Sequence, residues 1–498
     1  MAEILIKAPR EGIAQSPHVG YGDVRNLDIS SIPGIVRLNN ITAKKSLTTV
    51  VTLPQWIVKN PATPAEVYAL DSAGKVYKSA DSGASWALMT GFTAGGTGQG
   101  MAIWKNYLFV ARATAIDICG DGTATGITNA NWSNSWAGLT LTTDALWHPM
   151  FVSKNDGNLY IGAGKFISSV LEVSGQTFAP GTGATYTATA EALDLPANYR
   201  VKCLEELGNN LMIGTWQGTN VYDLRIADIF PWDRSATSFG QPINMEENGV
   251  HAMKNIGNSL VVLAGTDGKI YLCDGVNSTM IGQIPDSVSD LGGGKNIAWY
   301  PGAIANYKGK IFFGVSGNGT DAISGMGVYS LLRTSKGNIL THEHTISTAT
   351  DGTSYVVKIG AILPVTRDNL LIGWYDATPT ASYGIDAITT TSFSSSYVGY
   401  FESPFYTVGS LLQQKTPTEI EFNLVRPLRT GEGIRLAYRT DITATYTTIV
   451  TPTFTTDGAV VSVNTIYEFP PCEQIQFKVS FLGTTTTTPE LKNITVRW

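Results

Sequence analysis

His342 and His344, on either side of Glu343, are the closest pair of metal-binding side chains in the sequence. Residues two apart on a β-strand share a face, so the two imidazoles could bind one metal ion. The neighbouring residues supply no convincing third ligand, and the pattern favours a solvent-exposed strand. We therefore expect no metal site here, and no other segment of the sequence predicts a cofactor.

Motifs of the common nucleotide-binding and hydrolase families are absent. There is no P-loop, no G-x-G-x-x-G after a strand, no G-x-S-x-G and no H-E-x-x-H. A sialidase would need three converging arginines and a nucleophilic tyrosine with a carboxylate base, contributed by different parts of the chain. Arginine is scarce, and a linear sequence does not show convergence. We predict no catalytic residue and no enzymatic activity, with a sialidase-like glycoside hydrolase as an alternative.

The composition limits the partners. Only 15% of the 498 residues are charged, with 34 basic and 40 acidic side chains and a net charge of -6. Tight binding to nucleic acid needs clustered Lys and Arg, so only passive, non-sequence-specific contact with DNA is compatible with this chain. No apolar run reaches the roughly 20 residues that span a bilayer, so we expect no membrane insertion. Four cysteines without a C-x-x-C pair predict reduced, buried thiols, at Cys119, Cys203, Cys273 and Cys472.

A short aliphatic strand recurs about every fifty residues. The seven copies are Val67–Ala69, Leu108–Val110, Leu159–Ile161, Leu211–Ile213, Leu260–Val262, Ile311–Phe313 and Leu370–Ile372. After several copies a Gly-containing turn leads to a second strand, as in Asp71 to Tyr77 and Gly265 to Tyr271. The same partner strand recurs at Val221–Tyr222 and Val328–Tyr329. This pattern predicts antiparallel hairpins, because Gly accepts the positive φ of a tight turn.

Two hairpins per period make a four-stranded blade. We therefore predict an all-β chain with a seven-bladed β-propeller over residues 34–396. Gly34–Leu38 precedes the first repeat and is expected to close the ring by pairing with the blade around Leu370. An irregular β-solenoid, or two successive sandwiches with the same spacing, is the alternative.

Residues 79–86 match the S-x-D-x-G-x-x-W pattern of an Asp box. Asp81 can accept hydrogen bonds from backbone amides of its own turn, Gly83 can take the strained conformation, and Trp86 can pack back between strands. Sialidases and many non-enzymatic propellers resemble each other in this motif, which lies away from the catalytic face in those families. We expect Ser79, Asp81, Gly83 and Trp86 to stabilise a hairpin rather than to take part in chemistry.

The last part of the chain, residues 397–498, alternates strictly between apolar and polar residues. The alternation is clearest in 419–424, 434–439 and 475–481, and it predicts half-buried antiparallel strands. With further strands near Val460, Tyr467 and Ile494, this region predicts an antiparallel β-sandwich. The threonine run Thr484–Thr488 is expected to be a loop between the last two strands.

The first 33 residues have no repeat partner. A disordered tail is one interpretation. The alternative, which we favour, is an arm that docks on its own propeller or on a neighbouring subunit through Tyr21, Arg25, Leu27 and Ile29, since apolar side chains gain by burial.

The order of these parts resembles the propeller-bearing tail proteins of tailed bacteriophages, closest to the nozzle or packaged-DNA-stabilisation proteins of short-tailed phages. The most specific segments are Gly22–Asp28 followed by Pro33–Ile35, the strand end Tyr438–Asp441, and the closing strand from Pro489 to Trp498. The propeller repeats are more regular than a nozzle leads one to expect, which leaves a tail-tip or baseplate position open.

The resemblance implies a structural, non-enzymatic virion component of the phage tail, assembled in the host cytoplasm. It implies a homo-oligomer, a six-fold ring below the head–tail connector, that contacts adjacent connector or tail proteins, retains the packaged genome and forms the conduit for its ejection. A chain with few charges is expected to bind DNA weakly, which suits a conduit through which DNA passes. A glycan-binding tail-tip or receptor-binding propeller protein, with a host surface glycan as partner, is the alternative function.

Overall fold

The computed structural model of the chain describes most of its 498 residues. The described residues are 3–7, 9, 12–13, 21–45, 52–91, 96–142, 147–172, 186–217, 228–245, 247–284, 297–317, 325–335, 337–348, 356–377, 381–389, 392–395, 398–407, 419–450, 462–465, 467, 469–470 and 472–497. Every regular element within them is a β-strand, which confirms the predicted all-β class. None of them forms a helix long and apolar enough to span a membrane.

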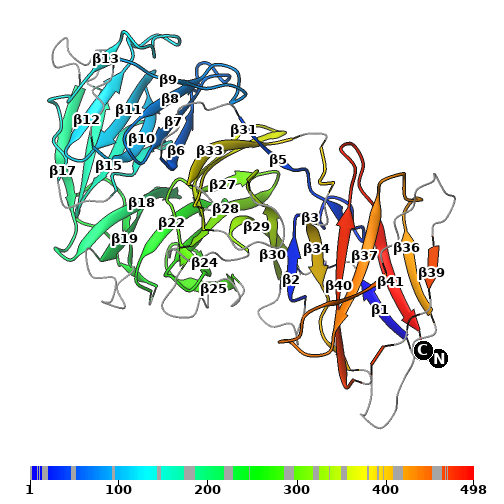
Figure 1. Cartoon of the computed structure of the whole chain (residues 1–498). Helices are drawn as coiled ribbons and strands as arrows, with labels where there is room; N and C mark the ends of the chain where they lie inside the picture. The colour runs from blue at the N-terminus through cyan, green and yellow to red at the C-terminus, as the bar shows by residue number, and fades with distance from the viewer. Residues whose placement is uncertain are drawn as a thin grey trace.

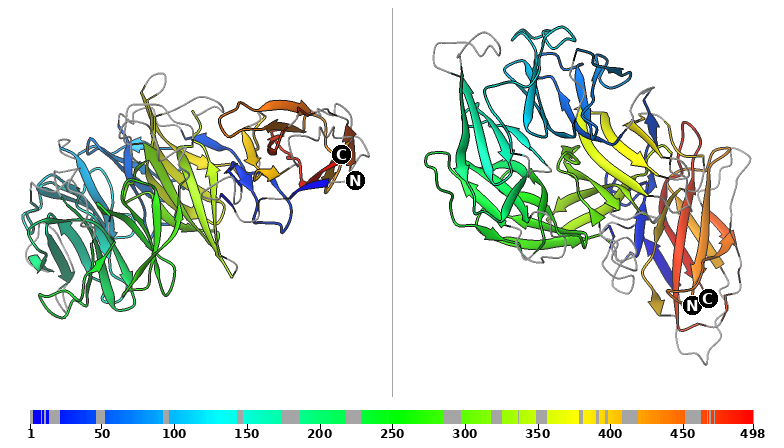
Figure 2. Two further views of the ribbon diagram at one scale, coloured as in Figure 1. Left: turned by 90° about the horizontal axis from the view of Figure 1, so that it is seen from below. Right: turned by 60° about the vertical axis from the view of Figure 1, so that its left-hand side comes forward.

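The strands form two lobes that lie side by side (Figures 1 and 2). The large lobe contains β5 to β33, and the small lobe contains β1 to β4 and β34 to β41. Both ends of the chain lie in the small lobe, where β1 (Glu3–Lys7) pairs antiparallel with β41 (Leu491–Arg497).

The large lobe is a series of small antiparallel sheets, most of them made of four strands consecutive in the chain. In chain order, the first three sheets are β6 (Pro54–Lys59), β7 (Val67–Asp71), β8 (Val76–Ser79) and β9 (Ala87–Leu88); β10 (Gly98–Trp104), β11 (Tyr107–Arg112), β12 (Ala115–Cys119) and β13 (Trp132–Ser133); and β14 (Met150–Val152), β15 (Leu159–Ala163), β16 (Phe166–Glu172) and β17 (Tyr186–Asp194). The fourth and fifth are β18 (Tyr199–Leu207), β19 (Asn210–Gln217), β20 (Asp228–Trp232) and β21 (Ile243–Asn244); and β22 (Val250–Asn255), β23 (Leu260–Ala264), β24 (Lys269–Cys273) and β25 (Ser278–Gln283). The sixth contains β26 (Ile297–Ala298), β27 (Ile304–Tyr307), β28 (Lys310–Gly317), β29 (Gly327–Thr334) and β30 (Gly337–His344), and the seventh contains β31 (Val357–Thr366), β32 (Asn369–Asp376), β33 (Ser382–Ile388) and β5 (Thr42–Lys44).

The predicted repeat coincides with the sheets. All seven aliphatic triplets lie in strands that pair with a neighbour on both sides: β7, β11, β15, β19, β23, β28 and β32. The predicted turn after Asp71 joins β7 to β8, and Gly74 in it has a φ of +77°. Val328–Tyr329 lies in β29, whereas the predicted partner strand at 221–222 lies outside the described residues.

The first strands of successive sheets, with β27 in place of β26 in the sixth, contact one another in a cycle. β6 contacts β10, and the contacts continue through β14, β18, β22, β27 and β31, which contacts β6 again. Glycines just after the triplets allow this approach. A Cβ on Gly214 would lie 2.7 Å from Val250 Cγ1 of the next sheet, and one on Gly314 would lie 2.5 Å from Ile359 Cβ. These glycines are therefore required where one sheet packs on the next.

The strand that joins the N-terminal part of the chain to the last sheet is not the predicted one. β5 pairs with β33, next to β32 and Leu370, so the predicted sheet is correct. Gly34–Leu38 instead contributes β4 (Arg37–Leu38), which pairs with β3 (Leu27–Asp28), and Val36 pairs with Leu491. Val36 and Leu38 are buried in the same core as the small-lobe sheets. Their apolar side chains are therefore already buried before the chain reaches the large lobe.

Two antiparallel sheets make up most of the small lobe. One contains β1, β41, β36 (Glu419–Leu424) and β39 (Ser462–Thr465), and the other contains β2 (Asp23–Arg25), β34 (Gly399–Glu402), β40 (Gln474–Leu482), β37 (Gly433–Arg439) and β38 (Thr447–Val450), with β35 (Tyr406–Thr407) paired to β40. Apolar side chains of both sheets share one core. The predicted strands 419–424, 434–439 and 475–481 are confirmed, and Thr484–Thr488 is the loop between β40 and β41. Tyr467 lies outside any strand, and Val460 lies outside the described residues.

One continuous sheet joins the lobes. Its order runs from β26 through β28, β29 and β30 to β2, and then through β34, β40 and β37 to β38. Arg25 pairs in parallel with His342 of β30 and antiparallel with Tyr400 of β34. The N-terminal strand β2 is therefore inserted between the two lobes (Figure 1).

Candidate functional site

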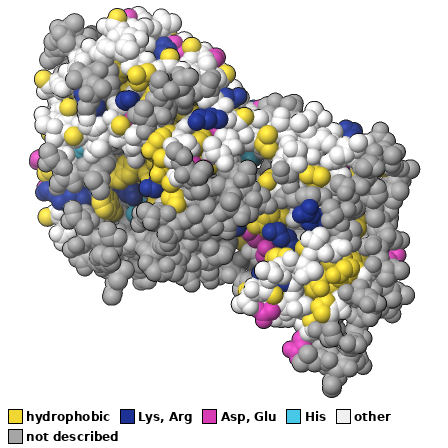
Figure 3. All heavy atoms as spheres, in the orientation of Figure 1, with side chains coloured by type: hydrophobic (Ala, Val, Ile, Leu, Met, Phe, Trp, Pro, Cys, Tyr) yellow, Lys and Arg dark blue, Asp and Glu magenta, His cyan; other side chains and the backbone are white. Residues whose placement is uncertain are grey.

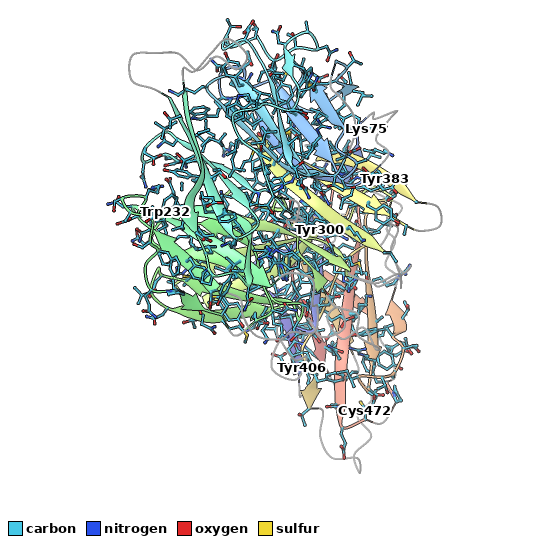
Figure 4. All side chains as sticks on the ribbon, turned by 90° about the vertical axis from the view of Figure 1, so that its left-hand side faces the viewer. Lys75, Trp232, Tyr300, Tyr383, Tyr406 and Cys472 are labelled. Atoms are coloured by element: carbon cyan, nitrogen blue, oxygen red, sulfur yellow. The ribbon has the colours of Figure 1, made fainter. Side chains whose placement is uncertain are left out.

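Aromatic and basic side chains from several sheets meet near the inner strands of the large lobe. Lys202 of β18 lies between two indoles, with its Nζ 5.7 Å from the ring centroid of Trp147 and 5.8 Å from that of Trp216. Trp147 also packs edge to face on Tyr300, with centroids 5.9 Å apart. Figure 4 shows Tyr300 near the middle of the lobe, with Trp232 and Lys75 toward its edge. We call Trp147, Lys202, Trp216, His251 and Tyr300 the inner cluster.

Burial determines the protonation of this cluster. Lys202 is 8% exposed, and burial lowers its pKa to about 7. Its Nζ lies 2.5 Å from Nδ1 of His251, whose pKa burial and the nearby Lys202 hold well below the usual value. Burial raises the pKa of Tyr300 to about 12. An amine with a pKa near 7 can act as a base, but this one is enclosed by two indoles and an imidazole, so the cluster fills space rather than presenting a reactive group.

The predicted Asp box forms as expected from its sequence. Ser79 Oγ donates to Asp81 Oδ1 at 2.7 Å, Ser85 N donates to the same oxygen at 2.8 Å, and Trp86 Nε1 donates to the Gly83 carbonyl at 3.1 Å. Burial opposes the charge on Asp81, but the hydrogen bonds from Ser85, Ser79 and Ala84 together outweigh it and lower the pKa of Asp81 to about 2. These residues begin at Ser79, the last residue of β8, and continue into the turn that follows it, apart from the inner cluster.

The four predicted arm residues contact other parts of the same chain. Tyr21 Oη donates to the Lys7 carbonyl at 2.8 Å, and the Tyr21 ring packs edge to face on Phe401. Leu27 and Ile29 are buried in the core that extends through the small lobe. The arm residues are thus brought together with β34 and β30.

Arg25 is the charged centre of the junction between the lobes. Its Nε lies 2.6 Å from Asp23 Oδ2, and its guanidinium lies 5.5 Å from the ring centroid of Tyr400, whose hydroxyl donates to Asp23 at 3.0 Å. Burial opposes its charge, but Asp23 and Tyr400 raise the pKa of Arg25 above its ordinary value. The ion pair is therefore buried and hydrogen-bonded, as a charge between two packed lobes must be.

A carboxylate beside this ion pair lies in the same buried junction. Burial and Asp23 raise the pKa of Glu402, against the nearby Lys478 and Arg439. Glu402 Oε2 lies 3.5 Å from Arg439 Nη2, and Lys478 Nζ lies 3.5 Å from the Tyr400 ring centroid. Spacing along the chain offers no sign of this junction, because its members come from β2, β34, β37 and β40.

The interpretation of His342 and His344 as a solvated strand is wrong. Both imidazoles are buried, and burial lowers the pKa of each to about 4. A register shift in the β29–β30 pairing lies beside them; His342 packs on Tyr329 and His344 stacks on Phe312. Within the described residues, no group of three or more His, Cys, Asp or Glu side chains could hold a metal ion.

All four cysteines are free thiols, as predicted, and three of them are buried. Cys472 is only partly buried, which differs from the prediction.

Several arginines already have carboxylate partners of their own. Arg37 pairs with Asp28, Arg112 with Asp117, Arg234 with Glu206 and Arg426 with Glu432. These pairs lie in different parts of the fold, and each arginine already has its own carboxylate partner, so these four arginines do not form the converging set that the sialidase alternative requires.

No family model matches the sequence, and no curated protein matches it. Among solved structures, the chain is similar to the WD40 repeats of RRP9, with 12% identity, 71% of this chain and 99% of that chain covered, and a TM-score of 0.47. It is similar to YCF48 from Cyanidioschyzon merolae, with 10% identity, 70% and 98% coverage and a TM-score of 0.44. It is similar to the β-propeller domain of Myceliophteria thermophila Cps50 (Swd1), with 11% identity, 70% of this chain and 100% of that chain covered, and a TM-score of 0.43. The strands themselves show the all-β fold of the described residues, and these similarities, all with TM-scores below 0.5, carry nothing about the activity of this chain.

Proposed function

We propose that this chain is a structural, non-enzymatic protein of a bacteriophage tail, a subunit of a ring that retains the packaged genome and forms the conduit for its ejection. The observation that carries a structural role is the continuous sheet from β26 to β38, with β2 inserted between the lobes. The backbone pairing of β2 with β30 and β34 joins the lobes, and the Arg25–Asp23 ion pair within β2 lies at this junction, which suits a structural building block. The assignment to a phage tail rests on the resemblance in the sequence.

The proposal includes a finer description of the fold. We infer that the sheets of the large lobe are the seven blades of a β-propeller closed by β5, and that the small lobe is a β-sandwich. The cyclic contacts of the first strands support the first inference, and the core shared by the two small-lobe sheets supports the second. The N-terminal arm, residues 1–33, and residues 397–498 together build the sandwich, since β1 and β2 pair with β41 and β34.

In this proposal the conduit for DNA lies between subunits and not through the propeller. Tyr300 lies near the middle of the large lobe in Figure 4, and its contact with Trp147 places two aromatic rings there. On the face shown in Figure 3, basic and acidic side chains are scattered among uncharged ones. Each phosphate that a free cation neutralises adds salt-dependent affinity, so a surface of this kind lets DNA slide past.

Electron microscopy of phage particles labelled with an antibody against this chain tests the proposal. We expect the label on the tail below the connector, and a ring of identical subunits in the reconstruction. In solution, a ring of six has a mass six times that of the 53.3 kDa chain. A chain that stays monomeric and is missing from purified particles would contradict the proposal.

A further inference from the structure

A polar cavity lies where the N-terminal arm meets the large lobe. Its volume is about 460 Å³, and its lining residues come from β3, β4, β27, β28, β29, β30 and β33 and the loops beside them. Figure 1 shows where β3, β27, β28 and β30 lie. This volume is within the range of small-molecule binding sites. The side chains that bear on its chemistry are Asp28, Arg37, Asn40, Tyr307, Phe312 and Glu343.

Tyr307 is the unusual member of this lining. The residue is 5% exposed, and its hydroxyl is buried without a hydrogen-bond partner in the described structure. A buried hydroxyl without a partner costs free energy, so such groups point to a missing ligand or water. Burial raises the pKa of Tyr307 against the opposing effect of the neighbouring Lys308, so the phenol stays neutral and can both donate and accept a hydrogen bond.

One exposed side chain covers this phenol. Lys308 lies with its Nζ 5.2 Å from the Tyr307 ring centroid and is 49% exposed in its side chain. Its only described ion pair is with the exposed Asp368 at 3.4 Å. Exposed ion pairs of this kind contribute little, so a ligand can displace Lys308 at small cost.

Apart from the weakly paired Lys308, the charged side chains Arg37, Lys310 and Glu343 of the lining are neutralised within the protein. Glu343 accepts hydrogen bonds from Lys310 at 2.6 Å and from Asn39 at 2.7 Å, and Arg37 pairs with Asp28 at 3.0 Å. A site for a phosphate or another anion would present unpaired cations. This lining instead suits a neutral ligand with many hydroxyl groups, which can donate to the carboxylates and accept from the amides.

Aromatic rings complete the lining. Phe312 and Phe393 border the cavity together with Tyr307, so aromatic side chains stand beside hydrogen-bonding groups. The C–H face of a pyranose is apolar and its hydroxyls are polar, and aromatic rings with carboxylate and amide neighbours match both kinds of surface.

We propose that this cavity binds a neutral saccharide of one or two pyranose rings, with the Tyr307 hydroxyl hydrogen-bonded to it. The site is independent of the tail assignment, since it requires only the contact between the arm and β27, β28 and β30.

The test is binding of D-glucose, D-galactose, N-acetyl-D-glucosamine and L-rhamnose to the full chain, measured by saturation-transfer NMR and calorimetry. We expect at least one of the four to bind, and Tyr307→Phe to weaken it about three- to tenfold, as expected for one neutral hydrogen bond. The melting temperature should be unchanged, because this hydroxyl has no partner in the described part of the protein. Asn40→Ala, which removes a second polar group of the lining, should weaken binding as well.

Tyr375→Phe is the matched control. Tyr375 lies in β32, stacks on Tyr383, and does not line this cavity, so its loss of a hydroxyl should leave binding unchanged. Three results would overturn the proposal: no binding of any of the four sugars, equal binding by wild type and Tyr307→Phe, or displacement of the bound sugar by inorganic phosphate, which would indicate an anion site. None of them bears on whether the chain is part of a phage tail.

Discussion

The indole of Trp147 and the phenol ring of Tyr300 pack edge to face at an interplanar angle of 81°, although one precedes β14 and the other precedes β27, three sheets further along the chain. Such a contact couples sheets that are not neighbours. We predict that a double-mutant cycle of Trp147→Ala and Tyr300→Ala gives a coupling free energy of about 1 kcal/mol in urea unfolding.

A second cycle serves as the control for this coupling. Tyr383 lies in β33 and stacks on Tyr375, and Figure 4 shows it away from Tyr300. Trp147→Ala and Tyr383→Ala should therefore be additive. Equal coupling in both cycles would mean that the large lobe responds as a whole, and that the Trp147–Tyr300 contact has no special role.

The buried Lys202 predicts a pH-dependent stability. Burial lowers its pKa from 10.5 to about 7, so between these pH values the unfolded chain binds a proton that the folded chain lacks. The free energy of unfolding should therefore rise with pH across this window, by up to about 1.4 kcal/mol per pH unit from this group. Urea unfolding of wild type and Lys202→Met at pH 7 to 9.5 measures this, and the methionine variant should lack this part of the slope.

Lys202→Arg distinguishes charge from size in the same experiment. Arginine stays protonated throughout the window, so its curve should also lose the slope but lie below that of Lys202→Met, because a charge remains buried. If the methionine variant keeps the full slope of the wild type, the pH dependence belongs to other groups.

Gly83 of the Asp box should resist substitution for two reasons. Its φ is +89°, and a Cβ would lie 2.6 Å from Cδ1 of the fully buried Leu371 in β32. We expect Gly83→Ala to lower the free energy of unfolding by about 1–3 kcal/mol more than backbone strain alone does.

Gly157→Ala is the control, because it introduces backbone strain at a positive φ without a steric clash. Gly157 has a φ of +74°, and no atom lies within 4 Å of the position that an alanine Cβ would take there. Urea unfolding compares the free energies of unfolding of the two variants. Equal decreases would show that the Leu371 side chain moves aside without a free-energy cost.

Docking of the N-terminal arm should depend on Leu27. This side chain is 0% exposed and lies in the core shared with the small lobe, so Leu27→Ala is expected to cost about 2–5 kcal/mol. Leu5→Ala is the control, since Leu5 is 38% exposed on β1 and its truncation should cost less than about 0.5 kcal/mol. Urea unfolding and limited proteolysis of the arm measure both, and similar effects of the two variants would contradict the arm's role.

The sequence predicts the repeating elements well because they are local. The seven triplets are buried in strands since each is apolar and bounded by turn residues, and the Asp box forms from hydrogen bonds within eight residues. Alternation likewise identifies β36, whose residues are buried at every second position.

Long-range pairing is harder to predict. The arm residue Arg25 pairs with His342 and Tyr400, and nothing near Arg25 in the sequence specifies either partner. The prediction of Gly34–Leu38 as the closing strand is wrong for the same reason. An apolar residue such as Val36 can be buried in either lobe, and its sequence does not specify that it pairs with Leu491 in the small lobe. The inner cluster draws on separate repeats, and only the three-dimensional contacts reveal it.

The insertion of β2 also determines where the molecule would yield under tension. β2 holds β34 through three residue pairs, but it holds β30 through the single pair of Arg25 with His342, extended by the hydrogen bond from Asn26 N to the His342 carbonyl at 2.9 Å. A force that pulls the lobes apart would therefore load this short pairing, together with the bridge between Gly12 and Leu340 of β30. On separation, β2 would stay paired with β34 in the small lobe, because three residue pairs hold it there against one pair with β30. The lobes would then separate while the sheets within each lobe stay folded.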